Sequence, residues 1–140
     1  ICIFTNNGKL VTSLTIDTTK EKETKLKLKM IGNTYVELMK KYTPSIVVIE
    51  QGFILHNASS QATFRTHGIT NFLFCEYQQI YYPPATVKKT VTGRGNAKKE
   101  EVRDCILKEH PEIKFSSIDE SDAYAVGQTY FIKTFGIGLK

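Results

Sequence analysis

Three carboxylates are spaced so that they could hold a divalent metal ion. Glu50 ends the apolar run that starts at Ser45, and Asp119 and Asp122 are three residues apart near the end of the chain. On a helix, residues at this spacing project to the same side. Carboxylate oxygens bind Mg²⁺ and can support phosphodiester hydrolysis. Spacing alone favours a structural role at this point, because acids favour helix N-termini and a strand-end glutamate can form a surface ion pair.

A glycine-containing loop from Thr92 to Lys99 is the second candidate for chemistry. Its two glycines would let the backbone approach a phosphate, and Lys98 and Lys99 begin the helix predicted to follow. The loop lacks the pattern G-x-x-x-x-G-K-[ST], which excludes a nucleotide-binding P-loop. The chain also has no G-x-S-x-G segment, and its histidines lack metal-ligand spacing. Taken alone, the loop fits an ordinary solvated connection.

The distribution of charge favours a nucleic-acid partner. The chain has 19 Lys and Arg against 14 Asp and Glu, for a net charge of +5. A basic excess by itself is a weak sign, because many small basic proteins bind no nucleic acid. Six basic residues are concentrated near the glycine loop: Lys88, Lys89, Arg94, Lys98, Lys99 and Arg103. The other basic run, 20–29, alternates with glutamates and predicts a solvated helix face.

Length and composition predict one globular domain. The 140 residues are 41% hydrophobic and 24% charged, which is typical of a folded domain of this size. No run approaches 18 consecutive apolar residues, so no membrane span is predicted. The three cysteines, an odd number without C-x-x-C spacing, predict neither a disulfide framework nor a zinc site and favour a reducing cytoplasm.

Periodicity predicts an α/β chain that could position these residues. The predicted strands are 1–4, 10–16, 45–50 and 80–82, the first two joined by the turn Asn6-Asn7-Gly8. The predicted helices are 22–42, 57–77, 97–110 and 117–135. The continuous β-branched run ending at Glu50 suits a strand covered on both faces, and ligands of open α/β sheets lie beyond such strand ends. Ser117 and Glu120 have the spacing of a capping box.

Three motifs occur in the order found in RuvC-type Holliday-junction resolvases. The run Val48-Ile49-Glu50-Gln51-Gly52-Phe53, followed by Asn57, resembles that family's V-x-I-E-Q-x-F…N segment. Residues 87–99 resemble its V-K-x-x-V-x-G-x-G-x-A-x-K segment, and residues 119–123 resemble its D-x-x-D-A segment. The three motifs have compatible spacings, and the resemblance extends over essentially the whole chain.

The resemblance implies an α/β, RNase H-like fold with a mixed central β-sheet flanked by helices, as a single domain over residues 1–140. It implies a cytoplasmic, Mg²⁺-dependent endonuclease, with Mn²⁺ able to substitute, that acts as a homodimer on four-way DNA junctions. The implied metal ligands are Glu50, Asp119 and Asp122, and Lys99 would join them in catalysis. The implied DNA contacts are Phe53, Asn57, Lys88, Lys89, Arg94 and Lys98.

One departure from the family pattern concerns the first strand. The family places its first catalytic aspartate on a central first strand, whereas Ile1 to Phe4 matches the second strand and Asp17 is a poor substitute. A sheet without its central strand leaves backbone groups unpaired, which favours a chain that begins after that strand. With three of the four acids, the chain as given is expected to bind metal poorly and cut little.

Two other functions fit the same residues. A catalytically inactive relative would recognise branched DNA without cutting it. Another RNase H-like nuclease would act on RNA–DNA hybrids. Cleavage assays that compare junction, duplex and hybrid substrates separate both from the junction-resolving nuclease.

Overall fold

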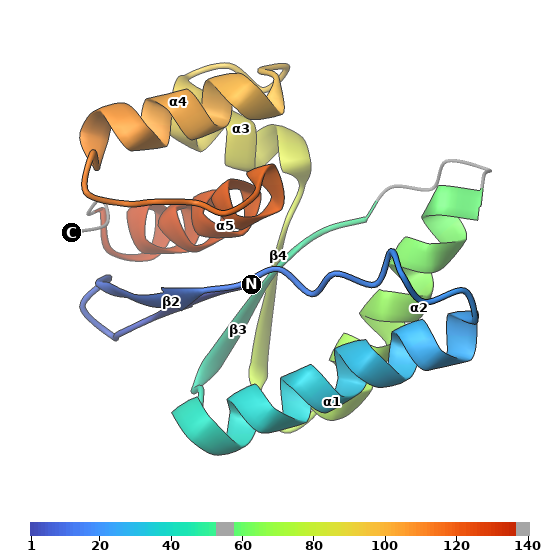
Figure 1. Ribbon diagram of the computed structural model, residues 1–140. Coiled ribbons are helices and arrows are strands. Elements are labelled where there is room, and N and C mark those ends of the chain that lie inside the picture. The colour runs from blue at the N-terminus through green and yellow to red at the C-terminus, as the bar shows by residue number, and fades with distance from the viewer. Residues whose placement is uncertain (53–57, 137–140) are drawn as a thin grey trace. The chain divides into compact units, whose positions relative to one another are not determined.

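The computed structural model describes residues 1–52 and 58–136, and in these the strands lie in the first part of the chain while three consecutive helices end it (Figure 1). The strands are β1 (Cys2–Phe4), β2 (Leu10–Ser13), β3 (Ile46–Glu50) and β4 (Gln78–Tyr82). The helices are α1 (Thr24–Tyr42), α2 (Ala58–Leu73), α3 (Pro84–Thr92), α4 (Lys99–Glu109) and α5 (Ile118–Phe135). The predicted α/β class is confirmed. Within the described ranges, no helix is long and apolar enough to cross a membrane.

The chain divides into two compact units, residues 1–15 with 81–140 and residues 16–80. Strands β1 and β2 form an antiparallel pair, and β3 and β4 form a separate two-stranded sheet. The sequence predicts one mixed sheet, and the strands differ from that prediction. A continuous sheet needs inner strands with partners on both edges, whereas each of the four described strands has a partner on one edge only.

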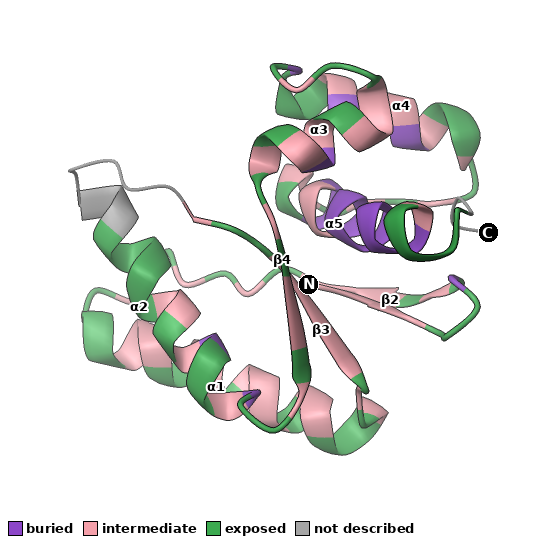
Figure 2. Ribbon diagram, turned by 180° about the vertical axis from the view of Figure 1, so that it is seen from behind, coloured by how far each residue is buried: buried purple, intermediate pink, exposed green. Residues whose placement is uncertain are grey.

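Helix α5 forms the centre of the first unit. Ten of its residues, from Glu120 to Phe131, are buried, and Figure 2 shows this burial along the helix. Strand β1 and helices α3 and α4 all pack against it. The Phe4 ring of β1 lies 5.4 Å from the Tyr124 ring and 6.0 Å from the Phe131 ring, centroid to centroid. A helix buried on all sides is typical of the core of a domain.

Helices α1 and α2 pack against each other in the second unit. The Tyr35 ring of α1 lies 5.5 Å from the ring of Phe74, which follows α2. Helix α1 ends at a left-handed Thr43, just before Pro44. Helix α2 ends at Leu73, earlier than predicted, because the chain then turns and leads into β4.

Helix α3 is the element that the sequence pattern missed. It contains five β-branched residues, which lower helix propensity, so the segment is typical of a loop or strand. Pro84 is its first residue, and Gly93 ends it with a φ of 78°. This proline-first, glycine-last arrangement was the available signal. Burial of Val87 adds the packing that the intrinsic propensity lacks.

Gly127 provides a test of the packing around α5. A Cβ atom at this position would collide with three atoms of the Phe4 ring. We expect Gly127→Ala to lower the free energy of unfolding by roughly 1–3 kcal/mol, as overpacked cores do. Urea unfolding followed by circular dichroism measures the change.

The matched control is Gly68→Ala in α2, where an added Cβ would meet nothing within 4 Å. Alanine there should raise the free energy of unfolding by about 0.5–1 kcal/mol, because glycine is the poorer helix former. Equal effects of the two substitutions would contradict the close approach of β1 to α5.

Candidate active site

The start of α5 presents Asp119, in the first turn, and Asp122, just after it, on one side of the helix. Ser117 is the N-cap, and its hydroxyl accepts a hydrogen bond from the Glu120 N–H at 3.2 Å. The Asp119 side chain is 70% exposed and that of Asp122 is 24% exposed. The two carboxylates are therefore accessible to a ligand from the same direction.

Lys99 joins these two aspartates. Its Nζ lies 2.5 Å from Asp122 Oδ2 and 3.4 Å from Asp119 Oδ1. Lys99 is the first residue of α4, which packs against α5 through a buried face that includes Val102 and Ile106. Three of the four predicted catalytic residues thus lie together in one unit.

The aspartates raise the pKa of Lys99 above its usual value of 10.5. The hydrogen bond to Asp122 is the largest cause, partial burial opposes it, and the charges of Asp122 and Asp119 add to it. Lys99 is therefore fully charged at neutral pH. Because the pKa of Lys99 is raised in the folded protein, its ion pairs stabilise the fold fully below pH 10.5. This stabilisation is lost as the pH rises through the raised pKa.

The glycine loop before α4 is ordered by its own contacts. The Thr92 hydroxyl accepts a hydrogen bond from the Arg94 N–H at 3.2 Å. A Cβ atom on Gly95 would lie 3.2 Å from the carbonyl oxygen of Ala85, so the loop passes very close to the start of α3. The close approach at Gly95 holds the loop near α3, while Gly93, Arg94 and Asn96 stay exposed, so the loop is a solvated connection that leads into Lys99.

The other predicted basic contacts lie on α3 and on this loop. Lys89 is exposed on α3, and Lys88 is partly buried beside it. Arg94 forms an ion pair with Glu101 at 2.7 Å, and the Lys98 N–H donates to the same carboxylate at 2.7 Å. The Lys98 N–H and Arg94, in that order, hold the pKa of Glu101 below its usual range. Arg94 therefore also stabilises the start of α4.

Glu50 belongs to the other unit, where it is the exposed last residue of β3. Strand β3 leads directly to Gly52, where a Cβ atom would lie 3.2 Å from Nε2 of His67 on α2. The chain therefore leaves the strand close against that helix. Phe53 and Asn57, the predicted junction contacts, lie outside the described residues.

Asp119 and Asp122 suit a divalent cation in their ligand type and in the direction of their carboxylates. Both carboxylates already converge on one positive charge, the Lys99 ammonium. Carboxylate oxygens are the ligands that Mg²⁺ prefers in proteins. Within the described part of either unit, no three His, Cys, Asp or Glu side chains cluster as a metal site, so Asp119 and Asp122 would be a partial ligand set.

Glu120 is a residue near the site that the sequence pattern assigned only to capping. Its side chain is buried and does not complete the capping box on Ser117. It accepts hydrogen bonds from the Ser116 N–H at 3.0 Å and from the Ser13 hydroxyl at 2.9 Å. Ser13 lies 107 residues away on β2, so no local pattern signals this contact.

Comparison with known proteins identifies the family. The sequence profile of "Crossover junction endodeoxyribonuclease RuvC" matches residues 2–130. The chain belongs to the RuvC family. The RuvC of Rickettsia typhi is 34% identical over 128 residues, which cover 89% of this chain and 82% of that protein. The RuvC of Bdellovibrio bacteriovorus is 39% identical over 102 residues, which cover 69% of this chain and 59% of that protein.

Solved RuvC structures share the fold. The Thermus thermophilus RuvC structure matches 99% of this chain and 89% of its own, with a TM-score of 0.76 and 20% identity. The same protein in complex with a Holliday junction substrate matches 98% of this chain, also with a TM-score of 0.76. The predicted RNase H-like fold and the predicted enzyme class, crossover junction endodeoxyribonuclease, are confirmed.

Asp122→Asn should return the pKa of Lys99 toward 10.5, because it removes the largest cause of the shift. Nitrogen NMR of the lysine ammonium groups, followed over the alkaline range in metal-free protein, measures this value. Glu101→Gln is the control, since Glu101 lies on the same helix but pairs with Arg94. An unchanged Lys99 pKa in Asp122→Asn would show that Lys99 and Asp122 do not form the ion pair described above.

Proposed function

We propose that this protein resolves four-way DNA junctions by metal-dependent hydrolysis of phosphodiester bonds. Membership of the RuvC family supports this activity, and the relatives are crossover junction endodeoxyribonucleases. The observation that carries the proposal is the convergence of Asp119 and Asp122 on the Lys99 ammonium. Such a group places two metal-type ligands next to a cation that can neutralise phosphate charge.

The family is one of divalent-metal-dependent nucleases, and we assign Mg²⁺ as the metal, with Mn²⁺ able to replace it. Asp119, Asp122 and Glu50 would be its ligands. A metal bound there would activate water and stabilise the leaving oxygen. The donor set supports this choice, because these residues offer only carboxylate oxygens, which suit both ions.

Lys99 would exchange its carboxylate partners for the scissile phosphate. Its charge is fixed at neutral pH by the raised pKa, so it needs no change of protonation to act. In the transition state the phosphate gains negative charge, and a lysine held nearby offsets it. Lys99 would therefore contribute more to the rate of cleavage than to the affinity for DNA.

The basic residues around the loop would hold the junction arms. Lys88, Lys89, Arg94 and Lys98 lie on α3 or between α3 and α4, in the same unit as Lys99. Contacts with phosphates release counterions, so the affinity for DNA should fall steeply with salt. Phe53 and Asn57 would contact the opened centre of the junction. The three cysteines are free, which agrees with the cytoplasm as the proposed location.

Loss of the carboxylates should abolish cleavage. With the protein made from its complete reading frame, we expect Glu50→Gln and Asp122→Asn each to cut a synthetic four-way junction about 10³-fold more slowly, since a metal contributes several kcal/mol. Single-turnover cleavage in Mg²⁺ measures the rates. No cutting by the wild-type protein would favour the inactive DNA-binding relative, and faster cutting of an RNA–DNA hybrid would favour the other nuclease.

Lys99→Ala in the same experiment separates catalysis from binding. We expect its cleavage rate to fall roughly 10²–10³-fold while its affinity for the junction changes little. Lys89→Ala is the matched contrast, because Lys89 is an exposed residue of the same unit that we propose as a DNA contact, so its replacement should lower the affinity for the junction and leave the single-turnover rate at saturating protein nearly unchanged. A loss confined to affinity in Lys99→Ala would contradict the catalytic role.

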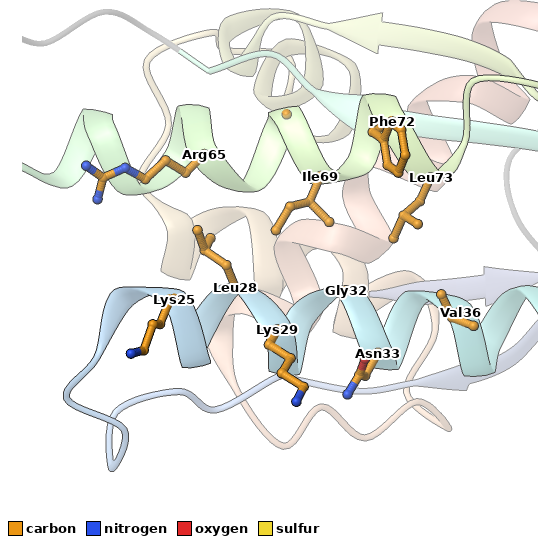
Figure 3. A pocket seen from close by; sticks show the side chains of 11 residues that line it. Lys25, Leu28, Lys29, Gly32, Asn33, Val36, Arg65, Ile69, Phe72 and Leu73 are labelled. Carbon is orange, nitrogen blue, oxygen red and sulfur yellow. The ribbon is translucent and has the colours of Figure 1, made fainter.

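We further propose that the protein acts as a homodimer through a groove between α1 and α2. Leu28, Ile69 and Leu73 point into the space between the helices (Figure 3). The basic side chains of Lys25, Lys29 and Arg65 also line the groove. Phe72 lies at its edge with 77% of its surface exposed. Contiguous apolar surface of this kind marks interaction sites on proteins. A second copy would bury it.

Phe72→Glu should therefore weaken self-association. Loss of an aromatic anchor typically costs roughly 2 kcal/mol or more, so we expect the dimer dissociation constant to rise at least about tenfold. Sedimentation velocity over a concentration series measures it. Val11→Glu is the control, because Val11 is 48% exposed on β2, outside the groove. Equal dimerisation of Phe72→Glu and the wild-type protein would exclude this groove.

A further inference from the structure

Glu120 lies between the two proposed metal ligands of α5, yet it does not face them. Asp119 is exposed and Asp122 is partly exposed, whereas Glu120 retains only 3% of its accessible surface. Successive residues of a helix are turned by about 100°, so Glu120 points inward while its neighbours point outward. A buried carboxylate is costly unless hydrogen bonds satisfy it. Its position therefore requires a set of donors inside the unit.

Those donors come from two other segments. The Ser13 hydroxyl of β2 donates to Glu120 Oε2 at 2.9 Å, and the Ser116 N–H donates to the same oxygen at 3.0 Å. Thr15, just after β2, donates to Glu120 Oε1 at 3.4 Å and shares a 2.6 Å hydrogen bond with the Ser117 hydroxyl. The side chain thus connects the end of β2 with the segment that enters α5.

The backbone of Glu120 takes part in the same connection. Its carbonyl oxygen lies 3.4 Å from the Cys2 sulfur of β1, and its N–H donates to the N-cap Ser117. The first turn of α5 cannot rotate or slide without breaking hydrogen bonds to both strands of the β1–β2 pair. Asp119 belongs to that turn and Asp122 begins the next one, so the direction of both carboxylates depends on these contacts.

We propose that Glu120 is a positioning residue for metal binding, resting on the proposed function of Asp119 and Asp122. By holding the first turn of α5 against β2, it fixes the angle at which the two carboxylates converge on one cation. Groups that orient metal ligands typically change metal affinity roughly 10- to 100-fold when they are replaced. Glu120 would act through backbone geometry, without touching metal or DNA.

The test is Glu120→Gln in the full-length protein. Glutamine has the same shape, but its amide group has one oxygen where the carboxylate has two. Either the Ser13 and Ser116 donors, which share Oε2, or the Thr15 donor on Oε1 would therefore face an NH2 group in place of an acceptor. We expect Mn²⁺ affinity, measured by electron paramagnetic resonance of free Mn²⁺, to fall roughly 10- to 100-fold. The affinity for junction DNA in metal-free buffer should stay within about twofold, because the basic residues are unchanged.

Phe131→Leu controls for stability alone. Phe131 is buried near the far end of α5, so its replacement should lower the unfolding midpoint and leave Mn²⁺ affinity unchanged. Wild-type Mn²⁺ affinity in Glu120→Gln would overturn the positioning role, whatever the change in stability. If Glu120→Gln does not fold, Ser13→Ala decides: weaker Mn²⁺ binding supports the role, and wild-type binding overturns it.

The experiment also separates this inference from the proposed nuclease. A wild-type protein that binds Mn²⁺ but leaves junctions uncut would overturn the proposed function. The Mn²⁺ affinity of Glu120→Gln would still decide whether Glu120 is a positioning residue. A wild-type protein that binds no Mn²⁺ would overturn both.

Discussion

Helix α5 has to be buried along most of its length while Asp119 and Asp122, near its start, stay charged partners of Lys99 and accessible to a ligand. Between residues 120 and 131, only Asp122 and Ala123 are not buried. A helix enclosed in this way needs neighbours on every side, and β1, α3 and α4 supply them. Gly127 lets the Phe4 ring reach the helix backbone. The helix that carries the acids at its start is therefore held in place by packing along most of its length.

The charges in the first turn of α5 balance one another before any metal is bound. Asp119 and Asp122 are close enough to repel each other, and two effects offset that repulsion. The partial positive charge of the helix N-terminus favours both acids. The Lys99 ammonium contacts both, with the shorter contact to the less exposed Asp122. A metal bound by the pair would compete with Lys99 for the same oxygens.

Local sequence patterns predicted most elements but not the contacts between distant segments. The stripe of apolar residues predicted α1, the β-branched run predicted β3, and the spacing of Asp119 and Asp122 predicted their common side. Helix α3 was missed because its stability comes from tertiary packing rather than from propensity. The hydrogen bond between Ser13 and Glu120 could not be predicted from the sequence, because no local pattern in either segment indicates the other as its partner. The roles of Glu50, Phe53 and Asn57 stay predictions.

The start of α4 supports the catalytic role that we propose for Lys99, because helix stability does not account for a lysine at this position. Cations at a helix N-terminus are unfavourable by roughly 0.3–1 kcal/mol each, and serine or aspartate is the preferred N-cap. Here Lys98 is the N-cap and Lys99 follows it. Glu100 and Glu101 restore negative charge in the first turn. The stabilising partners of Lys99 itself lie on α5, 2.5 and 3.4 Å away, and not on its own helix. Lys99 is thus unfavourable for its own helix and is stabilised only by acids on another helix. Residues of this kind are expected at functional sites, where the function and not local stability determines the residue type.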